Sequence, residues 1–184
     1  MFDFLPVVLA VFTALPGPAE SAAFNRTRPA IVRAPHQLLT AIDRPVRAPD
    51  PEIRQLLARG MARSPTFVAL MRALDHTDVI VYVEMTSKLP MNVAGRLLFA
   101  TASTSGPRYL RVQIARDGNA NVMVAAIAHE LQHAIEVANA LDVRDEAGLE
   151  RLYTRIGTRG ALAQSFDTLA AQLTGRRVLF EMQG

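Results

Sequence analysis

The segment from Val122 to Ala140 constrains the fold of this chain more than any other. It contains no Gly or Pro and is apolar on several faces, so it predicts a long and largely buried helix. Six polar residues interrupt it, and His129, Glu130 and His133 form the first group of these together with Gln132. Burying two histidines and a glutamate so close together leaves several polar groups that need partners. The fold must therefore supply those partners inside the protein.

The pentad His-Glu-Leu-Gln-His at 129–133 indicates a metal site. On a helix, residues i and i+4 share one face, so His129 and His133 can offer two imidazole nitrogens to one tetrahedral ion. Glu130 stands beside the first of them, where it can act on a water held by the metal. The alternative is an ordinary amphipathic helix whose histidines are exposed or hydrogen-bonded. We favour the metal, because it satisfies the buried polar groups.

Composition limits what else can build the site. The chain has 184 residues, is 50% hydrophobic and 20% charged, and so predicts a globular protein of one domain preceded by a processed segment. It has no cysteine, which excludes disulfides and thiolate ligands. A metal site must then consist of His, Asp and Glu side chains.

Residues 1–23 have the layout of a secretory signal. An apolar run extends from Phe4 to Leu15, and the small residues Ser21, Ala22 and Ala23 follow a Pro-Gly-Pro turn. We expect an exported protein, periplasmic or secreted, whose mature chain has no integral membrane span. Because the first residues carry Asp3 and no basic residue, a membrane-anchored N-terminus or a different start codon are alternatives.

Residues 24–50 are rich in proline and arginine. We expect an extended segment that packs along the domain with solvated arginines. An arginine arm that binds an acidic polymer, with the histidines incidental, is an alternative, and an anionic envelope surface is another acidic partner. No recognised nucleic-acid motif accompanies the arginines, so no nucleic-acid partner is expected.

The remainder, 51–184, predicts one α+β domain. The patterns indicate two short helices from Pro51 to Leu74, separated by the cap-and-first-turn pair Ser64-Pro65. The motif helix would start at Asn119 or Asn121, and two further helices are expected at 146–156 and 161–173, the last with an extension toward Met182. Strands are expected at 78–85, 96–101 and 108–115. Turn residues between consecutive strands predict a short three-stranded antiparallel meander that packs on the central motif helix, with the other helices flanking it.

A catalytic zinc site usually has three protein ligands and a water, so one more ligand is needed. His36 and His76 are expected to be surface or capping residues. Glu136 shares the helix face of the two histidines, but a continuous helix carries it away from the ion. We expect it to support a ligand, with direct coordination as the alternative.

Asp167 is the strongest candidate for the third ligand. It lies in the apolar stretch Phe166-Asp167-Thr168-Leu169-Ala170, where a carboxylate that faces the core needs a partner or a metal. A solvated Asp, or one that binds a backbone amide, is the alternative. Glu146 and Glu150 rank behind it, because both fall in a charged, surface-like stretch.

The His129-Glu130-x-x-His133 pattern resembles the signature of zincins, a class of zinc metallopeptidases, and an acidic third ligand on a later helix resembles their gluzincin branch. Together with Leu152-Tyr153 and the stretch around Asp167, it also resembles a group of small, uncharacterised, exported bacterial proteins. The metzincin extension is missing, since Glu136 replaces Gly and Asn139 stands at the third ligand position. Gluzincins have Glu where this chain has the shorter Asp167.

The resemblance implies a small zincin-like domain that binds Zn²⁺ and hydrolyses a peptide or protein substrate. Glu130 would be the general base, His129, His133 and Asp167 the metal ligands, and Tyr153 the stabiliser of the oxyanion, with Tyr109 and His76 as alternatives. Strand 108–115 would pair with an extended peptide. The alternative function is an exported metal-binding or interaction module that keeps the scaffold without catalysis.

Overall fold

The structure is a computed structural model that describes residues 8–9, 44–102, 104–116, 119–159 and 165–184. Most of the predicted signal segment, and the Pro/Arg-rich segment as far as residue 43 with His36, lie outside these ranges. Export, and the boundary predicted at residue 23, therefore stay predictions. None of the described helices has the length and hydropathy needed to cross a membrane.

Five helices occur in the described part of the chain, and their caps explain where they begin. Asp50 caps α1, Ser64 caps α2, Asn119 caps the motif helix α3, Asp145 caps α4 and Thr168 caps α5, in each case with a side-chain oxygen that accepts a backbone N–H. The predicted pair of short helices, the motif helix and the helix at 146–156 are confirmed. The helices are α1 (Pro51–Arg63), α2 (Pro65–Leu74), α3 (Ala120–Asn139), α4 (Glu146–Ile156) and α5 (Leu169–Gln183).

The main sheet corrects the predicted meander. It has four strands in the order β2-β3-β5-β4, and only β4 runs antiparallel to its neighbour. The α+β class is confirmed, but the three-stranded antiparallel sheet is wrong. Strand β5 is inserted between β3 and β4, so it cannot offer a free edge to a peptide as we expected for 108–115. The strands are β2 (Val46–Arg47), β3 (Val79–Thr86), β4 (Gly95–Thr101) and β5 (Arg108–Ala115).

The residue content of the strands explains this order. Strands β3 and β5 bury Val79, Val81 and Val83, and Leu110, Val112 and Ile114, on one face, and both are long enough to pair along eight residues. Strand β4 begins with Gly95 and ends in exposed residues, which suits the edge of a sheet. The link from residue 87 to 94 is long enough to cross to that edge, and turn residues alone do not show which strands become neighbours.

A second, smaller sheet corrects the element around Asp167. The predicted helix at 161–173 is wrong in its first part, because β7 (Ser165–Asp167) is a strand that pairs antiparallel with β6 (Thr158–Arg159) and parallel with β1 (Val8–Leu9). Thr168 then starts α5, since its hydroxyl accepts a hydrogen bond from the backbone N–H of Ala171. Asp167 therefore lies at the end of a strand, directly before a helix cap.

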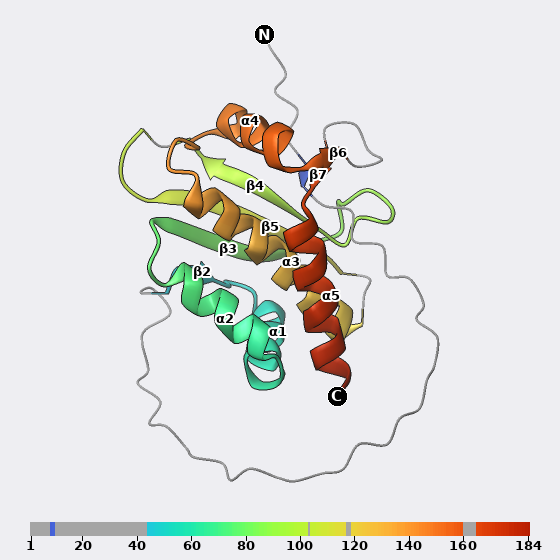
Figure 1. Cartoon of the computed structure of the whole chain (residues 1–184). Coiled ribbons are helices and arrows are strands. Elements are labelled where there is room, and N and C mark those ends of the chain that lie inside the picture. The colour runs from blue at the N-terminus through green and yellow to red at the C-terminus, as the bar shows by residue number, and fades with distance from the viewer. Residues whose placement is uncertain (1–7, 10–43, 103, 117–118, 160–164) are drawn as a thin grey trace.

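The motif helix α3 is the centre of the core. It packs on β3, β4 and β5 on one side and against α5 and α2 on the other. Figure 1 shows α3 between the sheet and α5, with α1 and α2 at one end and α4 at the other. Because both sides of α3 are covered, its histidines and Glu130 are buried.

A fully buried arginine fixes the far end of α3. Arg108, at the start of β5, pairs through two guanidinium nitrogens with Asp78 and donates to the carbonyl oxygens of Val137, Ala138, Ala140 and Val143. The last carbonyls of a helix lack intrahelical partners and carry the negative end of its dipole. The hydrogen bond from Arg108 also holds the pKa of the Asp78 carboxyl below its usual value. Arg108 thus joins the motif helix to the sheet.

We expect Arg108→Met to lower the free energy of unfolding by about 3–5 kcal/mol, because it leaves buried carbonyls and Asp78 without their partner. Arg111→Met is the matched control on the same strand. Its guanidinium is exposed and lies 3.8 Å from Glu84, so its loss should cost less than about 1 kcal/mol. Chemical denaturation measures both. Similar small losses for the two variants would contradict the anchoring role.

Candidate metal centre

Helix α3 brings the two histidines of the pentad together. His129 and His133 are separated by one turn and both are fully buried. Their Nε2 atoms lie 3.2 Å apart, and their rings meet edge to face with centroids 4.9 Å apart. Both Nε2 atoms therefore point at the same small volume, as the helical spacing predicted.

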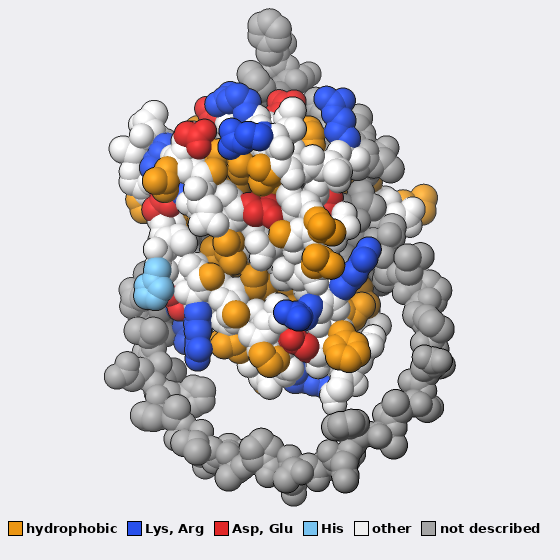
Figure 2. Space-filling model, viewed as in Figure 1, with side chains coloured by type: hydrophobic (Ala, Val, Ile, Leu, Met, Phe, Trp, Pro, Cys, Tyr) orange, Lys and Arg blue, Asp and Glu red, His pale blue; other side chains and the backbone are white. Residues whose placement is uncertain are grey.

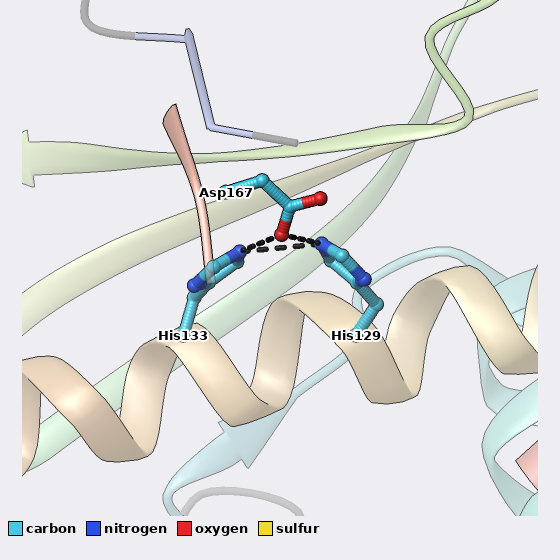
Figure 3. Close-up of side chains that lie close together, drawn as sticks. All are labelled: His129, His133 and Asp167. Atoms are coloured by element: carbon cyan, nitrogen blue, oxygen red, sulfur yellow. Dashed lines mark hydrogen bonds and ion pairs between the residues drawn. The ribbon is translucent and has the colours of Figure 1, made fainter. Parts of the chain in front are cut away.

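Asp167 reaches the same volume from β7, as Figure 3 shows. Its Oδ1 lies 3.3 Å from Nε2 of His129 and 3.7 Å from Nε2 of His133. Oδ1 also accepts the backbone N–H of Thr168 at 2.7 Å, and Oδ2 accepts from the amide of Gln172 at 3.0 Å. The first turn of α5 thus orients the carboxylate toward the histidines.

The three side chains have the arrangement that a tetrahedral ion requires. Bonds of about 2.0–2.1 Å from zinc to nitrogen or oxygen place neighbouring ligand atoms roughly 3.3 Å apart. The observed separations of 3.2, 3.3 and 3.7 Å agree with this spacing. In the described part of the chain, this is the one group of His, Asp and Glu side chains that could hold a metal ion.

Glu136, which is itself held by Thr168, contacts the side of His133 that faces away from the centre. One carboxylate oxygen of Glu136 lies 2.8 Å from Nδ1 of His133, and the other accepts the Thr168 hydroxyl at 2.6 Å. A proton on Nδ1, donated to Glu136, leaves the lone pair of Nε2 facing the centre. Glu136 therefore contacts the ring nitrogen that points away from the other two candidate ligands.

The proposed oxyanion residues do not gather at the centre in the same way. The buried Tyr153 lies with its ring edge-on to His133, 5.2 Å between centroids, and its hydroxyl donates to the backbone oxygen of His133 at 3.1 Å. Tyr109 follows the alternation of β5 onto the other face of the sheet, where with Tyr82 and Arg111 it lines a separate pocket of about 380 Å³. His76 lies in the turn between α2 and β3.

The charges of the cluster favour a cation. Burial lowers the pKa of His129. Burial also acts to lower that of His133, but hydrogen bonds to Asp167 and Glu136 outweigh it and raise the pKa to about 9. Burial would raise the pKa of Asp167, yet its hydrogen bonds with the two histidines lower it. The carboxylates of Asp167 and Glu136 thus favour a positive charge between them. A divalent ion supplies this charge when both histidines are neutral.

Glu130, the one acid of the pentad, is buried. Burial raises the pKa of its carboxyl well above the usual value, and the nearby His133 offsets this only in part. Its Oε2 atom has no hydrogen-bond partner among the residues that the structure describes. A buried carboxylate oxygen without a partner is costly unless it has a chemical task or a water to bind.

Sequence reasoning missed Gly95, which makes room for this carboxylate. A Cβ atom on Gly95 would lie 2.9 Å from Oε1 of Glu130 and 3.1 Å from its Cγ. Gly95 begins the edge strand β4, so the carboxylate of Glu130 lies under the start of that edge. A glycine at the head of a strand whose next residues are all larger is a signal of close approach that could have pointed to this position.

No protein-family model, curated protein or solved structure matches this chain.

We expect Gly95→Ala to lower the free energy of unfolding by about 1–3 kcal/mol, because the added methyl overpacks against Glu130. The same substitution in a Glu130→Ala background should cost at least about 1 kcal/mol less, since the opposing carboxylate is gone. Chemical denaturation of the four proteins of this double-mutant cycle measures the coupling. If the two changes in the free energy of unfolding are strictly additive, the methyl added at position 95 does not clash with Glu130.

Proposed function

We propose that the protein is a zinc-dependent metallopeptidase that hydrolyses peptide bonds with Glu130 as general base. The observation that carries the proposal is the convergence of His129, His133 and Asp167 beside a buried glutamate whose Oε2 has no partner among the described residues. A site that only stabilises the fold has no need of a buried base next to its ligands. The resemblance of the pentad to the zincin signature supports the same activity.

Each residue has a stated part in the proposed reaction. His129, His133 and Asp167 would hold the ion, which lowers the pKa of water toward neutrality and polarises a carbonyl when it is bound. Glu130 Oε2 takes a proton from the attacking water and gives it to the leaving amine. Burial raises its pKa, which makes the carboxylate a stronger base than an exposed glutamate and favours uptake of the proton.

The edge strand β4 is where we propose that the substrate pairs. It replaces the strand at 108–115, whose two edges are both occupied. An extended peptide can add to the edge of a sheet through main-chain hydrogen bonds, here next to β1, which also contacts β4. Because Gly95 of β4 lies against Glu130, a peptide on this edge would pass the proposed base.

We expect the purified protein to bind close to one equivalent of zinc, and His133→Ala or Asp167→Asn to weaken binding more than Glu136→Gln does. Loss of a residue that only orients a ligand costs roughly 10–100-fold in affinity, and loss of a ligand costs more. Competition with a chromogenic chelator measures the affinities. His76→Ala, a histidine in the turn before β3, is the control and should leave zinc binding unchanged.

Two outcomes would overturn this assignment. If the wild type holds no zinc above background, the metal centre is wrong. If Asp167→Asn keeps full zinc affinity while Glu136→Gln loses it, the third ligand is Glu136 and not Asp167.

We expect Glu130→Gln to keep zinc affinity within a few-fold and to lower peptide hydrolysis by roughly 10²–10⁴-fold, because the amide cannot accept the proton. Hydrolysis of a broad library of quenched fluorescent peptides measures the activity. A zinc-loaded wild type that cleaves none of them would favour the non-catalytic metal-binding module instead.

A further inference from the structure

The outward face of α5 carries an apolar stripe that nothing in the described structure covers. Leu169, Leu173 and Phe180 are 70%, 53% and 78% exposed. They follow one another by four and seven residues, which places them on one side of the helix. The opposite side, with Ala171, Gly175, Val178 and Met182, is buried, and α5 packs on α3. Figure 2 shows hydrophobic side chains gathered over α5 on the face toward the viewer.

Two arginines flank this stripe. Arg176 and Arg177 are exposed between Leu173 and Phe180, one on each flank of the stripe. The single acid in the sequence of α5 is Glu181, and its carboxylate is turned toward Ser64 and Thr66, from which it accepts hydrogen bonds. The face that α5 presents outward is therefore apolar along its centre and basic along its sides.

This pattern fits an anionic lipid surface. A helix that lies in the membrane interface buries a narrow apolar stripe at the level of the lipid headgroups and pairs flanking basic residues with phosphates. Arginine can keep its guanidinium at the headgroups while its stem lies along apolar surface. A stable protein–protein interface removes roughly 800 Å² from each partner, more than three side chains on one helix provide.

We propose that the outward face of α5 docks on an anionic lipid membrane, with Leu169, Leu173 and Phe180 in the interface and Arg176 and Arg177 on lipid phosphates. The stripe begins two residues after Asp167. Docking would hold the β7–α5 junction, which contributes Asp167 to the metal centre, near the lipid. The helix would lie on the surface and not cross it.

A local probe tests this docking in the full chain. Because the chain has no cysteine, Ala170→Cys and Leu141→Cys each give one site for an environment-sensitive fluorophore. Ala170 is exposed beside the stripe, and Leu141, 69% exposed, lies in the turn between α3 and α4. With vesicles of equal parts phosphatidylglycerol and phosphatidylcholine, we expect a blue shift and quenching by nitroxide-labelled lipid at position 170 only. Phosphatidylcholine alone, or high salt, should abolish most of the shift.

Matched variants carrying the label at position 170 test the two parts of the surface. Leu173→Glu with Phe180→Glu should weaken vesicle affinity at least tenfold. Leu141→Glu with Met91→Glu changes the charge equally and removes two other exposed apolar side chains, and it should stay within about twofold. Arg176→Gln should cost about fivefold at low salt, the equivalent of about 1 kcal/mol for one basic residue at an anionic surface.

Three results would overturn the proposal. The label at position 170 could remain in water while the protein binds vesicles, or the stripe variants could bind as tightly as the control pair. The wild type could also sediment as a dimer without lipid and the stripe variants as monomers, with no lipid-dependent shift, which would assign the stripe to a second copy of the chain. None of these readouts needs hydrolysis, and Glu130→Gln should bind vesicles like the wild type. Failure of the peptidase proposal therefore leaves this one intact.

Discussion

The buried guanidinium of Arg108 is the interaction on which the position of the motif helix depends. A helix that is apolar on several faces can pack on a sheet in many orientations, because apolar contacts have no direction. Arg108 removes this freedom, since its donors must meet Asp78 and the last carbonyls of α3 in one geometry. The C-terminal end of α3 is thereby fixed to the start of β5, and a rigid helix transmits this placement to His129 and His133.

The junction of β7 and α5 is the second constraint, because it combines three tasks in two residues. Asp167 faces both histidines. The Thr168 hydroxyl caps α5 and also donates to Glu136, which in turn holds Nδ1 of His133. The start of α5, the direction of one candidate ligand and the orientation of another are thus coupled. A shift of this junction would disturb the centre from two sides at once.

The sequence predicted those parts of the site whose spacing is local. One helical turn places His129 beside His133. The lack of cysteine limits the third ligand to His, Asp or Glu, and Asp167 was the strongest candidate among these. The sequence could not predict that Asp167 ends a strand, because a three-residue strand next to a helix cap has no periodicity to read. Strand order was wrong for a related reason, since turn residues do not reveal that β5 pairs with β3. Gly95 and Arg108 act on partners far away in the sequence, and no local pattern reports such contacts.

Helix α5 contributes to both the metal centre and the apolar stripe, but it does so through two different faces. Its inward face packs on α3, and its first turn orients Asp167 through Gln172 and the backbone of Thr168. Its outward face can change without altering those contacts, because Leu173 and Phe180 project away from α3. An isolated apolar side chain on a surface requires no explanation, but a stripe of three such side chains flanked by two arginines does. One helix can therefore serve two surfaces, and substitutions on each face separate their effects.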